Sequence, residues 1–174
     1  MRRPLMVLLA LVVTVAAGRA GGATPPELEP LAFLVGEWVA DGGGAPGAAS
    51  GRASFAAGLQ GTVMVRASYA EYPATAQRPS LRHDDLMVIY VDGGRVQADY
   101  YDNEGHVIRY ALTSPRPGEA CLVSEATAAA PRYRLVYTLG EDGVLKGEFA
   151  IAPPGKPDGF AVYLTWASRR VGGP

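Results

Sequence analysis

Cysteine, histidine and charge of one sign are all scarce in this chain, and each scarcity excludes something. The single cysteine, Cys121, allows no intramolecular disulfide, so the fold depends on its core and its strand pairing. With 16 Lys and Arg against 17 Asp and Glu, the chain has no basic stripe of the kind that nucleic acid binding requires. No histidine follows His106, which limits histidine-based chemistry to the first two thirds of the chain.

Long apolar runs are also rare, and the one that occurs lies at the N-terminus. Met1-Arg2-Arg3 precedes an apolar run over residues 5–17, and small residues follow through Ala23. A basic start, a short apolar run and small residues at its end are typical of a secretory signal peptide. We therefore predict a signal peptide over residues 1–23 and a secreted or periplasmic domain over residues 24–174, with no stable membrane span. The candidate cleavage sites follow Ala17, Ala20 and Ala23.

Helical periodicity is almost absent from the remaining chain, where strand signals dominate. One short helix is predicted near Thr24, because Leu28, Leu31 and Leu34 share a face and Pro30 keeps the helix short. Ten strands are predicted, over residues 36–40, 52–56, 62–72, 83–91, 95–102, 106–113, 120–126, 133–139, 144–152 and 160–170. Consecutive short antiparallel strands either stack as a sandwich or close into a barrel. We predict an all-β fold, an antiparallel up-and-down barrel of about ten strands with a short N-terminal helix.

The register of this barrel is predicted from residues 83–113, which contain the turn sequences DGG and NEG. Three-residue loops that end in glycine suit a type I turn followed by a left-handed residue. The predicted pairs are Val91 with Arg95 and Asp102 with His106.

This register and the apolar alternation of the other strands predict which residues face inward. Six of the nine tyrosines fall on the predicted inner face: Tyr69, Tyr90, Tyr100, Tyr110, Tyr133 and Tyr137. A close-packed core normally uses Leu, Ile and Phe, because each buried phenol needs a hydrogen-bond partner. Two interpretations therefore stay open, a solid core and a ligand cavity whose binding residues are Tyr69, Tyr90, Tyr100, Tyr110 and Tyr137. Three arginines, Arg66, Arg109 and Arg134, fall on the predicted outer face.

The predicted register also gathers Asp84, Asp102 and His106 in one row, with His83 beside them. Carboxylates and imidazoles could hold a divalent metal, which makes His83, His106, Asp84 and Asp102 candidate ligands. The same groups could form a general base, with His106, Asp84 and Asp102 as candidate catalytic residues. The alternative is a structural network at a turn, in which Asp102 caps residues 103–105.

Residues 31–38, LAFLVGEW, place a Gly-x-Trp on the first predicted strand, directly after the short helix. This pattern resembles the start of the calycin superfamily, which includes the lipocalins. The resemblance implies that Trp38 closes one end of the barrel against an arginine near the end of the last strand, where this chain has Arg169 and Arg170. Both arginines and Trp38 are therefore expected to have structural roles.

Over residues 28–170 the pattern is similar to bacterial fatty-acid-binding-protein-like and nitrobindin-like ten-stranded barrels. Two departures limit what the resemblance implies. Nitrobindin-type proteins hold haem through a late histidine, so haem is not expected in a chain that has none after His106. Fatty-acid-binding proteins use an Arg-x-Tyr on the last strand, and residues 160–170 contain none. No cofactor is predicted.

These observations favour an exported barrel that binds a small hydrophobic or amphipathic molecule, mostly apolar with a polar end, between loops 42–51 and 73–82. One alternative is an enzyme of isomerase or hydrolase type, or a metal site, that uses the Asp/His cluster at the barrel mouth. Another is a non-catalytic envelope or interaction module, which would show an exposed apolar patch or an unpaired edge strand. The sequence leaves the ligand, any reaction and the oligomeric state open.

Overall fold

A computed structural model describes residues 24–41, 50–113 and 116–172 of the chain. The predicted signal peptide lies outside these residues, and so does most of the predicted loop 42–51. Among the described residues, no helix is both long and apolar enough to cross a membrane.

The described chain forms ten strands and two short 3-10 helices, in nearly the order that the sequence predicts. The helices are η1 (Pro26–Leu34) and η2 (Leu59–Gly61). The strands are β1 (Gly36–Ala40), β2 (Ser50–Gly58), β3 (Val63–Tyr72), β4 (Leu81–Asp92), β5 (Arg95–Asp102), β6 (Val107–Leu112), β7 (Glu119–Ser124), β8 (Arg132–Leu139), β9 (Val144–Ala152) and β10 (Ala161–Arg170). Three predicted strands, β1, β5 and β9, match to the residue, and the others differ by one or two residues at one or both ends.

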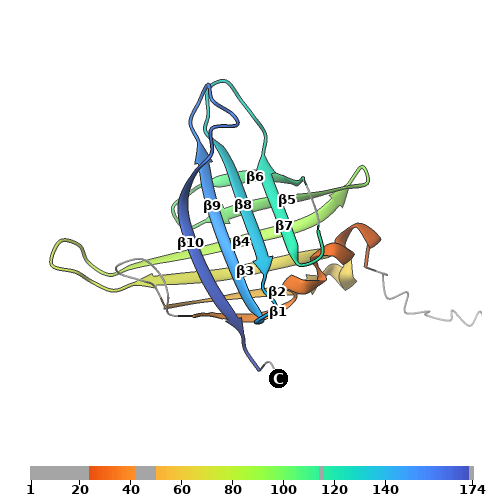
Figure 1. The fold of residues 1–174 in the computed structure, drawn as a ribbon, viewed down its shortest axis with the longest axis horizontal. Coiled ribbons are helices and arrows are strands. Elements are labelled where there is room, and N and C mark those ends of the chain that lie inside the picture. Colours follow the sequence, from red (N-terminus) through yellow and green to blue (C-terminus); the bar gives the residue numbers. More distant parts are fainter. Residues whose placement is uncertain (1–23, 42–49, 114–115, 173–174) are drawn as a thin grey trace, which may run out of the picture.

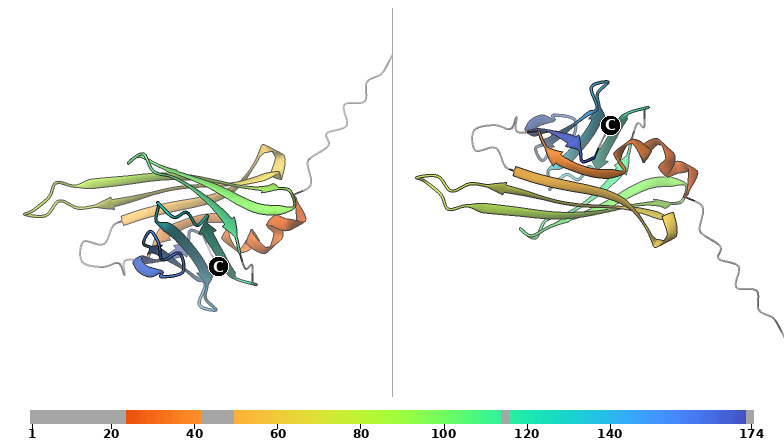
Figure 2. Two further views of the ribbon diagram at one scale, coloured as in Figure 1. Left: turned by 90° about the horizontal axis from the view of Figure 1, so that it is seen from above. Right: turned by 90° about the horizontal axis from the view of Figure 1, so that it is seen from below.

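All ten strands belong to one closed antiparallel barrel, in which each strand pairs with its neighbours in sequence and β1 pairs with β10. The predicted up-and-down barrel is therefore confirmed, and the sandwich is excluded. β8, β9 and β10 run across the direction of β2, β3 and β4, so the barrel is flattened into two crossing walls (Figure 1). β3 and β4 continue past their neighbours as a projecting hairpin (Figures 1 and 2).

Helix η1 covers one end of the barrel, which we call the closed end. Leu28, Leu31 and Leu34 are buried, and their spacing of three suits the three residues per turn of a 3-10 helix. Trp38 on β1 is 1% exposed, and its indole N–H donates to the carbonyl of Leu34 at 2.8 Å. The opposite end, where the 103–105 turn lies, is the mouth.

Of the two predicted turns, one is confirmed and the other is wrong by one residue. β5 and β6 pair in the predicted register, with Gln97 opposite Ala111. β4 and β5 instead pair Asp92 with Arg95, which leaves a two-residue turn of Gly93 and Gly94. Both glycines have positive φ, 54° and 73°, as a type I′ hairpin turn requires at its two central residues.

This slip inverts the predicted faces of β3 and β4, because successive side chains of a strand alternate between its two faces. Met87 and Ile89 are completely buried and face the interior, where the prediction placed Leu86 and Val88. Arg66, predicted to lie outside, pairs in register with Met87 and is buried. Tyr69 and Tyr90, predicted to lie inside, are on the outer face.

Candidate functional site

The interior of the barrel differs between its two ends. At the closed end the inward-facing side chains are buried, among them Phe55, Met87, Ile89 and Leu145. Toward the mouth, inward-facing residues are partly exposed: Tyr100, Ile108, Tyr133, Phe149, Ile151 and Trp166. An inward-facing side chain can be partly exposed only where it borders space that solvent reaches, so the mouth half of the interior is accessible.

A buried ion pair lies at the boundary between these two halves. Arg66 on β3 and Asp85 on β4 approach to 2.7 Å, with side chains 10% and 7% exposed. Ser68, directly opposite Asp85 in the register, donates its hydroxyl to the carboxylate at 2.6 Å and accepts from Arg66 at 2.9 Å. Each charge is thus neutralised and hydrogen-bonded, as burial of an ion pair requires. We call Arg66, Ser68, Asp85 and the adjacent Tyr137 the interior polar cluster.

Tyr137 on β8 completes the interior polar cluster from the opposite wall. Its ring lies 6.0 Å from the Arg66 guanidinium and packs edge-on against Phe55 and Trp166. Gly147, opposite Trp166 on β9, has no side chain, and any Cβ there would overlap the indole ring. Burial raises the pKa of Tyr137 to about 12, although the charge of Arg66 acts in the opposite direction.

Among the described residues, two polar atoms of the interior polar cluster have neither a hydrogen bond nor an ion-pair contact, whereas Asp85 Oδ1 has only its ion pair with Arg66. The two atoms are the Tyr137 hydroxyl and the Arg66 Nε, and both are buried. A buried donor or acceptor without a partner costs about 1–3 kcal/mol, so such atoms generally meet water or a ligand. The cluster therefore offers hydrogen bonds to a small group inside the barrel.

The five predicted ligand-binding tyrosines divide between the two faces of the wall. Tyr100 and Tyr110 face inward beside the cluster, and burial first of all raises the pKa of each. Tyr69 lies outside under the guanidinium of Arg82, 4.1 Å from its ring centroid. Tyr90 lies outside and donates its hydroxyl to Asp99 at 3.3 Å.

The predicted Asp/His row is only partly formed. Asp102 and His106 approach to 2.8 Å, and the Asp102 carboxylate also accepts from the main-chain N–H groups of Glu104 and His106. Burial alone would raise the pKa of Asp102, but these hydrogen bonds outweigh it and lower the pKa. Asp84 instead faces outward and pairs with Arg82 at 2.8 Å, because the register places Asp85 opposite Asp102.

His83 faces inward at the mouth, where its ring contacts Glu104 at 2.9 Å and the Tyr100 hydroxyl at 3.1 Å. Tyr100 in turn donates to Asp102 at 3.3 Å. His83 and His106 are thus linked through Tyr100 and Asp102 by a chain of hydrogen bonds at the mouth. Among the described residues, no group of three or more His, Cys, Asp and Glu is placed to hold a metal ion.

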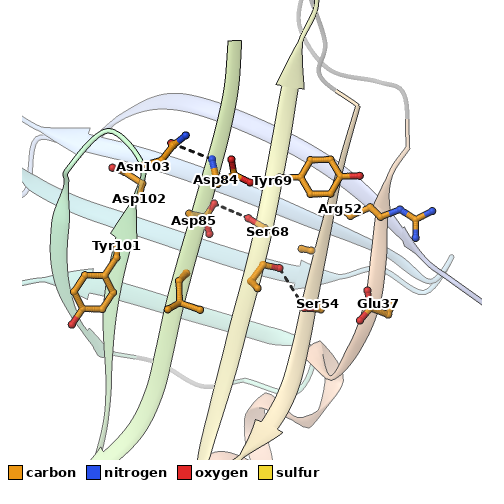
Figure 3. A pocket seen from close by; sticks show the side chains of 13 residues that line it. Glu37, Arg52, Ser54, Ser68, Tyr69, Asp84, Asp85, Tyr101, Asp102 and Asn103 are labelled. Carbon is orange, nitrogen blue, oxygen red and sulfur yellow. Dashed lines mark hydrogen bonds between the residues drawn. The ribbon is translucent and has the colours of Figure 1, made fainter.

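A separate hollow of about 610 Å³ lies on the outer wall of β1–β5 (Figure 3). Most of its lining residues belong to the face opposite Phe55, Arg66 and Met87, and Ala53, Ser68, Asp85 and Asp102 of the inner face also border it. The outer-face residues include Glu37, Arg52, Ser54, Ala67, Tyr69, Asp84, Leu86 and Tyr101. The small Ser54 and Ala67 lie between larger neighbours on either side, which makes this part of the wall concave.

At the closed end, the structure places Arg170 rather than Arg169 over Trp38. The Arg170 guanidinium lies 4.3 Å from the indole and donates to the carbonyls of Phe33 and Val35. Arg169 points outward and pairs with Asp41 at 3.0 Å. Arg170 therefore links β10 to the end of η1 and the residue after it, and Arg169 links β10 to Asp41, directly after β1.

Comparison with protein-family models and with curated proteins finds no match for this chain.

Arg66 and Asp85 are the site residues that the sequence prediction missed. The signal that identifies them is the Gly93-Gly94 pair, since Gly-Gly favours a two-residue type I′ turn. A two-residue turn places Asp85 opposite Asp102 and turns Arg66 inward along with it.

Proposed function

We propose that this protein is a binding protein whose barrel interior holds a small, mostly apolar molecule with an uncharged polar end. The apolar part lies in the mouth half, against Tyr133, Phe149 and Trp166. The polar end reaches the interior polar cluster and forms hydrogen bonds with Tyr137 and Arg66. The observation that carries this proposal is the pair of buried, unpartnered atoms at the inner limit of the accessible space.

The charge of the cluster supports an uncharged end rather than a carboxylate. Arg66 is already neutralised by Asp85 at 2.7 Å, so a bound anion would add a second negative charge beside Asp85. A hydroxyl or carbonyl group adds no charge and can still accept a hydrogen bond from Arg66 or Tyr137. The class of ligand is therefore an apolar alcohol, ketone, ester or amide.

The calycin resemblance of residues 31–38 supports the same proposal. A closed ten-stranded barrel is compatible with that superfamily, in which the interior commonly holds small apolar molecules. We also propose that the protein is exported through the predicted signal peptide. Comparing the mass of the protein recovered outside the cytoplasm with that of the full chain tests this point, since cleavage would remove 17, 20 or 23 residues, the positions of the three candidate sites.

Displacement of the neutral fluorophore 1-aminoanthracene by decanol and by decanoate tests the binding proposal. We expect the fluorophore to bind and decanol to displace it more effectively than decanoate. Replacement of Tyr137 by Phe should weaken decanol binding about five- to tenfold, because it removes one hydrogen bond, while the free energy of unfolding stays equal or rises.

The matched control is Tyr101→Phe, which removes a hydroxyl from an exposed residue of the outer wall and should leave decanol binding unchanged. Absence of fluorophore binding, or equal decanol affinity in the Tyr137→Phe variant and the unaltered protein, would contradict the proposal.

A further inference from the structure

The central part of the outer face of β3 and β4 is apolar, although the barrel interior lies on the other side. Between the two strands, cross-strand neighbours on this face include Val65 with Val88 and Ala67 with Leu86. The next strands extend the second of these pairs into a transverse row. From β1 to β6 the row reads Glu37, Ser54, Ala67, Leu86, Tyr101 and Val107.

The large members of this row are well exposed in the described chain. Leu86 is 41% exposed, Tyr101 is 42% exposed and Val107 is 60% exposed. The small members, Ser54 and Ala67, lie in the outer hollow of about 610 Å³ (Figure 3). An apolar ridge and a concave surface thus stand side by side on one wall, and contiguous apolar surface of this kind is typical of an interaction site.

We infer that this wall is the interface of a homodimer, with the two-fold axis parallel to the strands and midway between β3 and β4. Such an axis reverses the row in the second copy, because a two-fold interface places the same patch against itself. Ala67 then lies against Leu86 of the other copy, and Ser54 lies against Tyr101. Every small side chain of the central row meets a large one, and Val65 meets Val88 in the row beside it.

The charges at the margins agree with this arrangement. Glu37 is at the β1 end of the row, and Arg109 lies beside the β6 end with its side chain 85% exposed. Reversal of the row brings Glu37 of one copy toward Arg109 of the other. It likewise brings Arg52 on β2 over β5 of the other copy, one strand away from Asp84 on β4. An axis perpendicular to the strands would instead place Leu86 against Leu86 and Glu37 against Glu37.

Sedimentation velocity of the purified protein over a concentration series tests the inference. We expect a monomer–dimer equilibrium, and we expect both Ala67→Leu and Leu86→Ala to raise the dissociation constant at least about tenfold. The first variant places leucine against leucine, and the second leaves a gap at two symmetric places. The double variant Ala67→Leu/Leu86→Ala exchanges the two sizes and should restore the dissociation constant to within about threefold of the original.

Leu86→Lys should abolish the dimer, and Val162→Lys is the matched control because Val162 is 55% exposed on β10, outside this wall. Circular dichroism verifies that each variant is folded. A monomer at every concentration, equal effects of the two lysine variants, or a double variant no better than the singles would overturn the inference. It would also be overturned if native mass spectrometry shows a monomer carrying a small molecule that Leu86→Lys removes.

Discussion

Around the buried ion pair, the two faces of β3 and β4 reverse the distribution of polarity that is usual for a sheet with one face in the interior. The inner face carries Arg66, Ser68 and Asp85 toward the mouth, whereas the outer face carries valines, Ala67 and Leu86. The inner polar groups are tolerated because they pair with one another and border accessible space. The outer apolar groups have no such explanation within one chain. In this protein, polarity alone therefore does not distinguish the inner face of β3 and β4 from the outer face.

The largest effect that this comparison predicts is on the buried ion pair. Replacement of Arg66 by Met leaves the Asp85 charge buried and unpaired, so we expect a loss of about 3–5 kcal/mol in the free energy of unfolding measured with urea. The matched change on the outer face, Arg52→Met, should cost less than about 0.5 kcal/mol.

The double variant Arg66→Met/Asp85→Leu removes both charges and should recover most of the lost stability. If Arg66→Met and Arg52→Met lowered the free energy of unfolding by equal and small amounts, Arg66 would be solvated. The inner and outer faces would then not differ in how they hold charge.

A smaller effect is expected from adjacent apolar residues on opposite faces of β4. Ile89 is completely buried in the interior, so Ile89→Ala should cost about 2–4 kcal/mol, including the cavity that it leaves. Val88 lies on the outer face and is partly exposed, and Val88→Ala should cost less than about 1 kcal/mol at protein concentrations that favour the monomer. If Val88→Ala lowered the free energy of unfolding in urea more than Ile89→Ala, Val88 rather than Ile89 would face the interior, as the sequence predicted.

The smallest effect concerns pH at the mouth. Because the pKa of Asp102 is lowered in the folded protein, its contribution to stability is present above the unfolded pKa near 4 and is lost as the pH falls through the folded pKa. We expect Asp102→Asn to lower the free energy of unfolding by about 1–2 kcal/mol at pH 7 and to reduce the acid dependence.

The control for this prediction is Asp84→Asn on the outer face, whose exposed pair with Arg82 should contribute less than about 1 kcal/mol. Parallel unfolding curves against pH for Asp102→Asn and the unaltered protein would contradict the assignment.

The sequence was sufficient to predict the architecture, because turn residues and short apolar runs mark each strand independently of the others. It was also sufficient for the β5–β6 register, since the Asn103-Glu104-Gly105 loop has one glycine at the position that needs positive φ. At Asp92-Gly93-Gly94-Arg95, two turn lengths were compatible with the residues, and the choice between them decided which face of β4 lies inside.

The alternation of apolar and polar residues could not correct the choice of turn length, because both faces of β3 and β4 contain apolar residues. Met87 and Ile89 on one face are no more apolar than Leu86 and Val88 on the other. Only the closure of the barrel, which makes one face common to all ten strands, distinguishes them. The ion pair between Arg66 and Asp85 could not be predicted before that closure was known.

Two junctions of the ring have a consequence for how the interior is reached. Among the described residues, β1 pairs with β10 at three positions, and β6 pairs with β7 at three positions. These short junctions divide the ring into a plate of β1–β6 and a plate of β7–β10. Separation of the two plates at these junctions breaks few main-chain hydrogen bonds. We therefore expect the amides of the two junctions to exchange with solvent deuterium through local opening. A guest molecule could then enter while both plates stay folded.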